Sequence, residues 1–252
     1  MAESLQKQLS GFPKGMEAVA NEEGEVYISY QKVYLPGQTM VCVFVTNASK
    51  RTFSNGYTAA VQTQNGLFLR CDANPKADLK EKQNLDRQLL SAPSLAEKKT
   101  STIMIGIFCN HPHSIGNNSI QVRIQPTAGV PVNLTLPVDI KDLIRPTKMS
   151  VQQYGGMWKR LPKEIKETLR NASVGDISAF NGIASACNMA LVKIIGKECI
   201  LAAKLVTGSK NNVLCLVHAK VRSGSEMVFM ARSSHAAFSA AVLGLVRDAC
   251  SA

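Results

Sequence analysis

The sequence predicts two domains: an immunoglobulin-like antiparallel β-sandwich, followed by an α+β platform in which an antiparallel sheet is flanked by helices. The length of 252 residues fits two domains better than one. Short apolar or alternating runs separated by turn residues fill the first half, and helical periodicity becomes frequent only after Pro146. We therefore expect a flexible lead-in at 1–24, a β-sandwich at 25–145 and a platform at 146–252.

The first half predicts at least six short strands and almost no helix. Strands are expected at 26–30, 40–45, 57–62, 67–71, 102–108, 119–124 and 132–138. Asn65-Gly66 predicts a tight turn between two extended runs. Residues 72–99 are polar and predict a long surface connection, with one helical turn near Leu85–Leu90. This pattern is typical of an antiparallel sandwich.

The second half predicts three helices around an antiparallel meander. A first helix is expected from Met157 to about Asn171, with Pro162 permitted only near a helix start or as a break. Asp176 is expected to cap a helix at 177–187, and Ser234 a final amphipathic helix. Four strand-like runs lie between these helices, at 189–195, 199–206, 213–221 and 227–231.

The net charge is +11, and most of it falls after residue 145. A basic second domain suggests an acidic partner, which could be a peptide, a nucleic acid or a lipid headgroup. The sequence has no apolar run long enough to span a bilayer and no secretory signal, so we expect a soluble intracellular protein. A nucleic-acid-binding module stays an alternative, although no RNA-recognition, KH or zinc-finger pattern occurs.

Neither the cysteines nor the histidines form a catalytic or metal-binding motif. The seven cysteines are an odd number without any C-x-x-C pair, which predicts reduced, mostly buried thiols. Cys109, His111 and His113 have ligand-like spacing, but no matching pair occurs elsewhere. We therefore expect no enzyme activity, no cofactor and no metal.

The only tryptophan, Trp158, lies at the expected domain junction. Tyr154 precedes it by one helical turn, and Lys159 and Arg160 follow it. The ring is either a core anchor at the domain seam or the floor of a pocket for an aromatic-containing peptide. In the second case the neighbouring cations would steer an acidic peptide toward it.

The residues around this junction resemble a known family. The run VNLTLPVDIKDLIRPTKMSVQQYGGMWKRLP contains the groups Pro146-Thr147-x-Met149 and Trp158-Lys159-x-Leu161. It resembles the joint between sandwich and platform in an adaptin appendage (ear), and is most similar to the alpha subunit of the plasma-membrane clathrin adaptor. A beta-type adaptin appendage is the alternative within the family.

The resemblance implies a binding module rather than an enzyme. Adaptin appendages recruit endocytic accessory proteins by binding short motifs, of the DPF, DPW or FxDxF type, in a platform pocket around the tryptophan. The resemblance also implies a cytoplasmic protein that is peripheral on coated pits and vesicles. Its partners would be the other adaptor subunits, and it would bind no nucleic acid. The expected peptide-binding residues are Tyr154, Trp158, Lys159, His218, Lys220 and Arg232.

The sequence departs from the family pattern at four positions of the expected pocket. The family's aromatic residue three positions before the tryptophan falls at Gly155, its pocket arginine at His218, an acidic position at Lys220 and a further basic position at Val228. These departures predict a pocket that is shallower, prefers a more acidic motif or has been lost.

Overall fold

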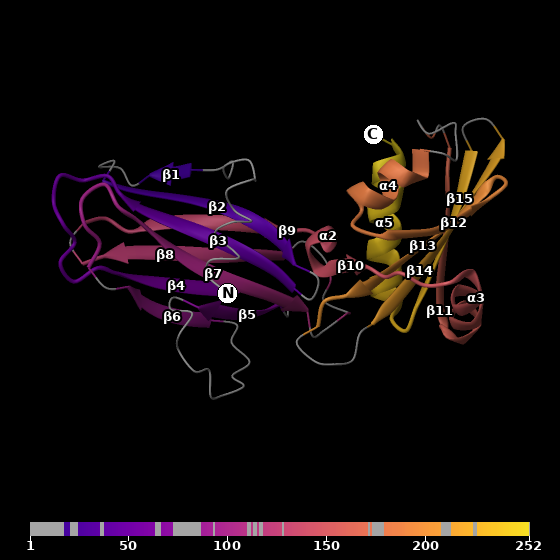
Figure 1. Ribbon diagram of the computed structural model, residues 1–252, viewed down its shortest axis with the longest axis horizontal. Helices are drawn as coiled ribbons and strands as arrows, with labels where there is room; N and C mark the ends of the chain where they lie inside the picture. The colour runs from indigo at the N-terminus through magenta and orange to yellow at the C-terminus, as the bar shows by residue number, and fades with distance from the viewer. Residues whose placement is uncertain are drawn as a thin grey trace. The chain divides into compact units, whose positions relative to one another are not determined.

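The computed structural model describes the chain except for residues 1–17, 21–24, 36–37, 64–66, 73–86, 93, 110–111, 113–114, 116–117, 128, 171, 173–178, 208–212, 224–225 and 252. The chain divides into two compact units (Figure 1). One comprises Met1–Phe108 and Asn118–Val138, and the other Cys109–Asn117 and Asp139–Ala252. Ala18–Ala20, in the expected lead-in, forms a short strand paired with the next one. The expected boundaries at 25, 145 and 146 stay predictions.

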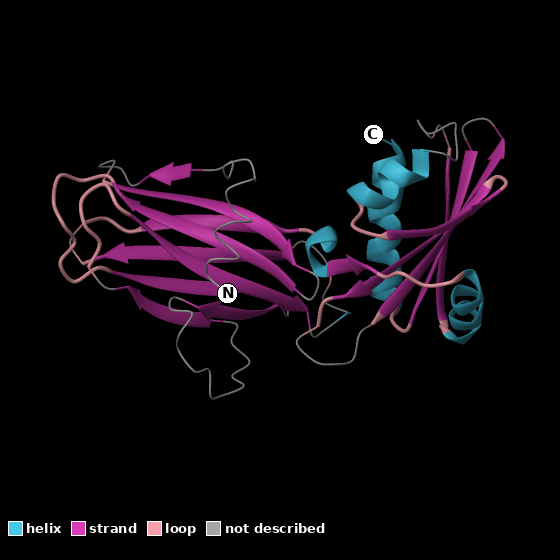
Figure 2. Ribbon diagram, in the orientation of Figure 1, coloured by secondary structure: helices cyan, strands magenta, loops and turns pink. Residues whose placement is uncertain are grey.

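The first unit consists of two antiparallel sheets, as the sequence predicts (Figure 2). One sheet has, in spatial order, β1 (Ala18–Ala20), β2 (Val26–Leu35), β3 (Gln38–Asn47), β7 (Thr100–Cys109) and β5 (Leu67–Asp72). The other has β6 (Arg87–Ala92), β4 (Tyr57–Thr63), β8 (Asn118–Pro126) and β9 (Val132–Val138). Alternate residues of the central strands, such as Val41, Ile105 and Val122, are almost fully buried and form the core.

Two details of the first unit differ from expectation. The helical turn near Leu85–Leu90 is wrong for the described residues, because β6 is a strand that pairs with β4, Leu90 opposite Ala59. Exposed Leu89 and Ser91 alternate with half-buried Leu90, a period of two that suits a sheet. The turn at Asn65-Gly66 lies outside the described residues, and the strands on either side of it belong to different sheets.

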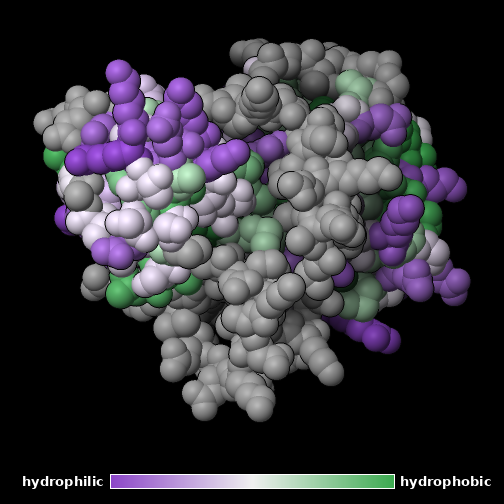
Figure 3. All heavy atoms as spheres, turned by 60° about the vertical axis from the view of Figure 1, so that its left-hand side comes forward, coloured by the Kyte–Doolittle hydropathy of each residue, from purple (hydrophilic) through white to green (hydrophobic). Residues whose placement is uncertain are grey.

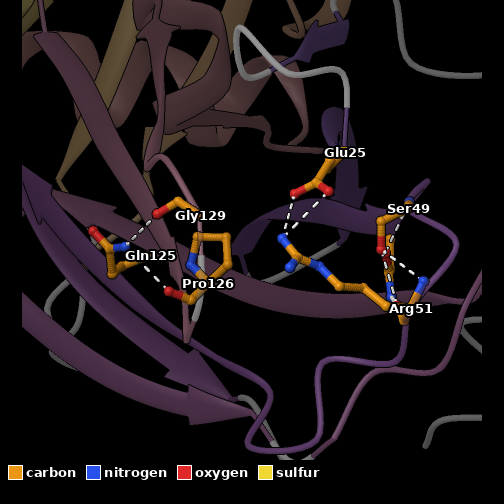
Figure 4. A network of polar contacts seen from close by, with 7 residues as sticks. Glu25, Ser49, Arg51, Gln125, Pro126 and Gly129 are labelled. Atoms are coloured by element: carbon orange, nitrogen blue, oxygen red, sulfur yellow. Dashed lines mark hydrogen bonds and ion pairs between the residues drawn. The ribbon is translucent and has the colours of Figure 1, made fainter.

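The turn that follows β3 is held by side chains rather than by a strand ladder (Figure 4). The buried amide of Asn47 donates to the carbonyl oxygens of Arg51 (2.8 Å) and Leu95 (3.0 Å). Ser49 Oγ donates to Asn47 Oδ1 (2.7 Å), and Arg51 Nη2 lies 3.0 Å from Glu25 Oε2. These side chains therefore link the turn to Leu95 and to Glu25, which lie elsewhere in the sequence.

The second unit is built on a six-stranded antiparallel sheet. Its order is β10 (Ile144–Pro146), β13 (Glu198–Leu205), β14 (Leu214–Ser223), β15 (Glu226–Ser233) and β11 (Lys163–Leu169), and β12 (Ala190–Ile195) also pairs with β13. The helices are α2 (Ile140–Leu143), α3 (Val151–Arg160), α4 (Phe180–Ala186) and α5 (Ala236–Ser251). Helices α3 and α5 lie on opposite faces of the sheet (Figures 1 and 2).

The strand alternation assigns residues to these two faces. Leu201, Val217 and Ala231 are cross-strand neighbours on the face toward α5, and each is fully buried. Ala202 and Leu216 are neighbours on the other face, where α3 packs. The platform therefore has apolar side chains on both faces of its central strands, as expected of a sheet covered on both sides.

The predicted helix from Met157 to Asn171 is wrong in its position. Helix α3 begins earlier because Ser150 caps it: Ser150 Oγ accepts from Gln153 N (3.1 Å), and Gln153 Oε1 accepts from Ser150 N (2.8 Å). It ends at Arg160, before Pro162, which has no N–H to continue a helix. Residues 163–169 form β11 instead, since their exposure alternates with a period of two.

The other platform predictions hold in part. All four meander strands are present as β12 to β15, while β10 and β11 extend the sheet beyond the prediction. Helix α4 is shorter than the predicted helix, and its expected cap Asp176 lies outside the described residues. Just before α5, Ser233 Oγ accepts from His235 N (3.0 Å) and donates to His235 O (2.6 Å), while the expected cap at Ser234 stays a prediction.

Cys42, Cys109, Cys187, Cys199, Cys215 and Cys250 are buried and lie outside any disulfide. Burial raises the pKa of Cys187 to about 11 and that of Cys199 and Cys250 to about 12. His111 and His113 lie outside the described residues, among which no metal-ligand cluster occurs. No helix in the described part of the chain has the length and apolar character to cross a membrane.

Candidate peptide-binding site on the platform

Helix α3 sets the positions of the two aromatic residues of the expected site. Tyr154 and Trp158 are four residues apart and therefore lie on one face of the helix. Tyr154 is 6% exposed and its hydroxyl donates to Val217 O (2.9 Å). Burial raises the pKa of this phenol far above its usual value. Tyr154 is therefore the fixed point by which α3 is attached to the sheet.

Trp158 lies on top of this anchor. Its ring stacks on Tyr154, with centroids 5.6 Å apart and planes at 17°, and its edge meets His218 at 6.0 Å and 84°. It packs against a buried cluster that contains Tyr154, Ile200 and Leu216, yet the residue itself is only partly buried. The indole is thus neither sealed in the core nor a free surface side chain, and part of it is open to solvent.

Arg232 on β15 contacts both the ring and the backbone of Trp158. Its Cζ lies 5.0 Å from the ring centroid, and Nη1 donates to Trp158 O (3.0 Å). Nε lies 2.6 Å from Glu164 Oε2, so the guanidinium is already ion-paired. Trp158 O is among the last carbonyls of α3, where a cation is favoured by the helix dipole. Arg232 therefore positions Trp158.

A three-residue polar group borders the ring on the side of His218. His218 Nε2 lies 2.9 Å from Glu198 Oε2, and Lys220 Nζ donates to Glu198 Oε1 (2.6 Å). The hydrogen bond from Lys220 is the main cause that lowers the pKa of Glu198, and the one from His218 adds to it. Glu198 thus neutralises the positive charge of Lys220, one of the expected peptide-binding residues.

The structure brings together five of the six expected residues. Tyr154, His218 and Arg232 each contact Trp158, and Lys220 joins His218 through Glu198. Lys159 is exposed on α3, with no ion-pair partner among the described residues.

Two of the four departures have a structural account. Tyr154 supplies the ring beside Trp158 that Gly155 lacks, and a Cβ at Gly155 would meet nothing within 4 Å. At Val228 the side chain is 3% exposed and offers no charge.

Sequence reasoning does not find Glu164 and Glu198. Both are cross-strand partners of expected site residues, Glu164 of Arg232 and Glu198 of Lys220. An opposite charge at the paired position is the signal that could have found them. It becomes readable only once the register of the sheet is known.

Comparison with known proteins finds one family model, which matches within the second unit, and two similar proteins. Residues 146–249 match the family model described as the adaptin AP4 complex epsilon appendage platform. The AP-4 complex subunit epsilon-1 of Mus musculus is 24% identical over 133 residues, which cover 51% of this chain and 12% of that protein. The human AP-4 complex subunit epsilon-1 is 22% identical over 135 residues, which cover 52% of this chain and 12% of that protein.

These matches confirm an adaptor appendage domain of a non-enzymatic family, and they correct the expected subtype. The expected resemblance to the alpha subunit is wrong, because the matching model and relatives are of the AP-4 epsilon type. They likewise give no support to a beta-type appendage or to a nucleic-acid-binding module. Residues 146–249 are thus similar to the appendage platform of AP-4 epsilon.

Proposed function

We propose that this chain is the appendage of an AP-4 epsilon-type adaptor subunit and that its platform captures short linear motifs of accessory proteins on the face covered by α3. The observation that carries the proposal is the partly exposed Trp158 ring, held by Tyr154 and Arg232. A large aromatic ring fixed in place at a partly open surface is the kind of residue that dominates binding energy at interfaces. The similarity to AP-4 epsilon subunits supports the assignment to an adaptor subunit.

The chemistry of the rim favours an aromatic motif with few acidic residues. His218 and Lys220 both bond to Glu198, so they add little unpaired positive charge to the site. Arg232 is paired with Glu164, so Lys159 is the one cation of the expected set without an ion-pair partner among the described residues. The motif would therefore gain most of its affinity by burying an aromatic side chain against Trp158.

Binding of this kind is weak for one motif and strong for several. A single short motif is expected near a micromolar dissociation constant, about −8 kcal/mol. Several motifs on one disordered partner raise the overall affinity without any new type of contact. The adaptor would then release a partner that offers one motif and retain a partner that offers many.

The cellular setting belongs to the same proposal. The chain spans about 12% of the length of the curated relatives that it matches. We propose that the remaining adaptor subunits hold it at a cytoplasmic membrane surface as a peripheral component. The matches give no specific support to clathrin-coated pits or endocytosis, so the relevant membrane is open.

Calorimetry with synthetic peptides tests the site. The probes are an FxDxF peptide, a DPW peptide and a variant of the first in which the aspartate is replaced by serine. At least one should bind, with the serine variant equal to or tighter than its parent. Trp158→Ala should weaken it by roughly 2 kcal/mol, about 30-fold.

Val151→Ala is the matched control, because Val151 is an exposed apolar residue of the same helix. It should leave the affinity unchanged. Equal binding by the wild type and Trp158→Ala would move the site away from this ring. Equal losses in the two variants would show that α3 matters only as a folded element.

A further inference from the structure

Strand β11 forms an edge of the platform sheet. It pairs with β15 through seven consecutive residue pairs, from Lys163↔Ser233 to Leu169↔Met227, without a register shift. No strand in the part of the chain that the structure describes pairs with its other edge. About half of the N–H and C=O groups of an edge strand point away from its neighbour. β11 therefore presents a straight row of backbone donors and acceptors.

The opposite edge is less regular, because the short strand β10 and the strand β12 both pair with β13 there. β12 pairs with β13 through a register shift between Leu191 and Lys193. Such a bulge twists a strand and interrupts its pairing pattern, which makes it a poor template for an added strand. β11 has neither a bulge nor an internal proline. Of these two edges, β11 is the one suited to take up another strand.

The charges along β11 are unbalanced. Its two carboxylates are paired with arginines from other elements: Glu164 with Arg232 at 2.6 Å and Glu167 with Arg247 at 3.3 Å. The cations Lys166 and Arg170 are exposed and have no ion-pair partner among the described residues. The same holds for Lys163 at the start of the strand. The edge is therefore positive although its sequence contains as many acidic residues as lysines.

We propose that the free edge of β11 binds an extended acidic segment of a partner protein by strand addition. A second copy of β11 is disfavoured, because pairing two such strands would place lysines close together. An acidic segment instead places carboxylates opposite Lys166 and near Arg170. This site is distinct from the one at Trp158, since its main contacts are the unpaired backbone groups along the edge of β11.

The faces of β11 specify the sequence pattern of the segment. Ile165 and Leu169 are half-buried on the face toward α5, so residues opposite them should be apolar. Lys166 is exposed on the other face, so the residue opposite it should be acidic. The five central residues of the segment should therefore be, in order, an apolar residue, an acidic residue, any residue, a polar or acidic residue, and an apolar residue. A peptide with Val, Asp, Thr, Asp and Val in this order fits in either strand direction.

The experiment uses this peptide, blocked at both ends, on the ¹⁵N-labelled full chain. Amide resonances of β11 should shift, and hydrogen exchange should slow at alternate β11 residues. A peptide of the same sequence with N-methyl groups on alternate backbone nitrogens keeps the charge but loses the donors of one edge. It should not bind.

Two charge reversals separate strand addition from general attraction. Lys166→Glu should weaken binding about fivefold or more. Lys193→Glu makes the same change at the other edge, on β12, and should leave affinity within about twofold. Equal losses, or binding by the N-methylated peptide, would overturn the proposal. Resonance shifts confined to α3 would also overturn it. The same holds if the chain binds anionic vesicles and both charge reversals weaken that binding equally.

Discussion

Arg232 is the residue on which the position of Trp158 depends most. It contacts the indole ring, donates to the carboxylate of Glu164 and donates to the carbonyl of Trp158 itself. Only a planar guanidinium can make these contacts at once, because a lysine has one nitrogen and no face to stack. The ring is therefore held from the sheet as well as from its own helix.

Replacing Arg232 should destabilise the platform, and lysine should not restore it. We expect Arg232→Ala and Arg232→Lys each to lower the free energy of unfolding by about 1–2 kcal/mol, as measured by urea denaturation. Glu164→Gln removes the partly exposed ion pair alone and should cost less, under about 1 kcal/mol. Full stability in Arg232→Lys would show that charge, rather than shape, is what matters here.

Glu198 should make the stability of the platform depend on pH in the acidic range. Its folded pKa lies below its ordinary value, chiefly because Lys220 donates to the carboxylate. In that range the unfolded state binds more protons than the folded state, so stability rises with pH. The contribution is complete above the ordinary glutamate pKa of about 4.3 and is lost as pH falls through the folded pKa.

Glu198→Gln should flatten this dependence. Unfolding free energies measured between about pH 6 and pH 3 should fall less steeply in the variant than in the wild type. At neutral pH the variant should be the less stable of the two, since it lacks the two charge-assisted bonds. Parallel curves for both proteins would mean that Glu198 contributes nothing through its charge.

At the scale of elements, α3 is a short helix with an unusual pair of residues in its middle. Gly155 and Gly156 are both exposed, and a Cβ on either would meet nothing within 4 Å. Glycine in a helix interior costs about 1 kcal/mol relative to alanine, through the entropy of the unfolded chain. The helix is held by its cap, Tyr154 and Arg232 rather than by propensity.

Alanine at these positions should therefore stabilise the chain. Gly155→Ala and Gly156→Ala are each expected to raise the free energy of unfolding by about 0.5–1 kcal/mol. Gly196→Ala is the contrasting variant: it also has open space, but its φ of +58° is unfavourable for a side chain. It should destabilise by a similar amount. A loss of stability at Gly155 or Gly156 would indicate that the open helix surface is covered in solution.

The elements also show where sequence reasoning succeeds and where it stops. The strands from β12 to β15 are predictable because their apolar runs are bounded by turn residues. β11 is not, because Lys163 and Lys166 are three apart and fit a helix face as well as a strand. Only its pairing with β15, which is a long-range contact, decides between the two.

The candidate site can likewise be predicted from the sequence only in part. Trp158 and Tyr154 can be found from the sequence, because a single tryptophan one helical turn after a tyrosine stands out. Glu198 cannot, since its role depends on lying opposite Lys220 in the register of two strands. The neutral character of the rim is thus a property of the sheet and not of any local motif.

For the whole molecule, the distribution of charge decides between two kinds of partner. Every carboxylate that the structure describes in the second unit has an ion-pair or hydrogen-bond partner, while many of its lysines and arginines have none. On the face drawn in Figure 3, hydrophilic side chains project outward and apolar ones show in small areas between them. Unspecific attraction of polyanions at low salt is expected from such a surface.

Salt dependence should separate this attraction from motif binding. A single-stranded oligonucleotide should bind the chain at low ionic strength and be released at roughly 150 mM salt, with a steep log–log slope. A peptide bound through Trp158 should keep most of its affinity, since the contact is mainly apolar. Fluorescence titrations at several salt concentrations measure both. Oligonucleotide binding that persists at high salt would favour a nucleic-acid-binding function.

The central claim is that the Trp158 ring is held in place and partly open to solvent. Collisional quenching of the chain's fluorescence by acrylamide tests this directly, because there is only one tryptophan and every photon of indole emission comes from it. The native chain should show a quenching constant clearly above that of a buried indole and below that of the urea-unfolded chain. A native indole that acrylamide cannot quench, with emission shifted to the blue, would contradict the account.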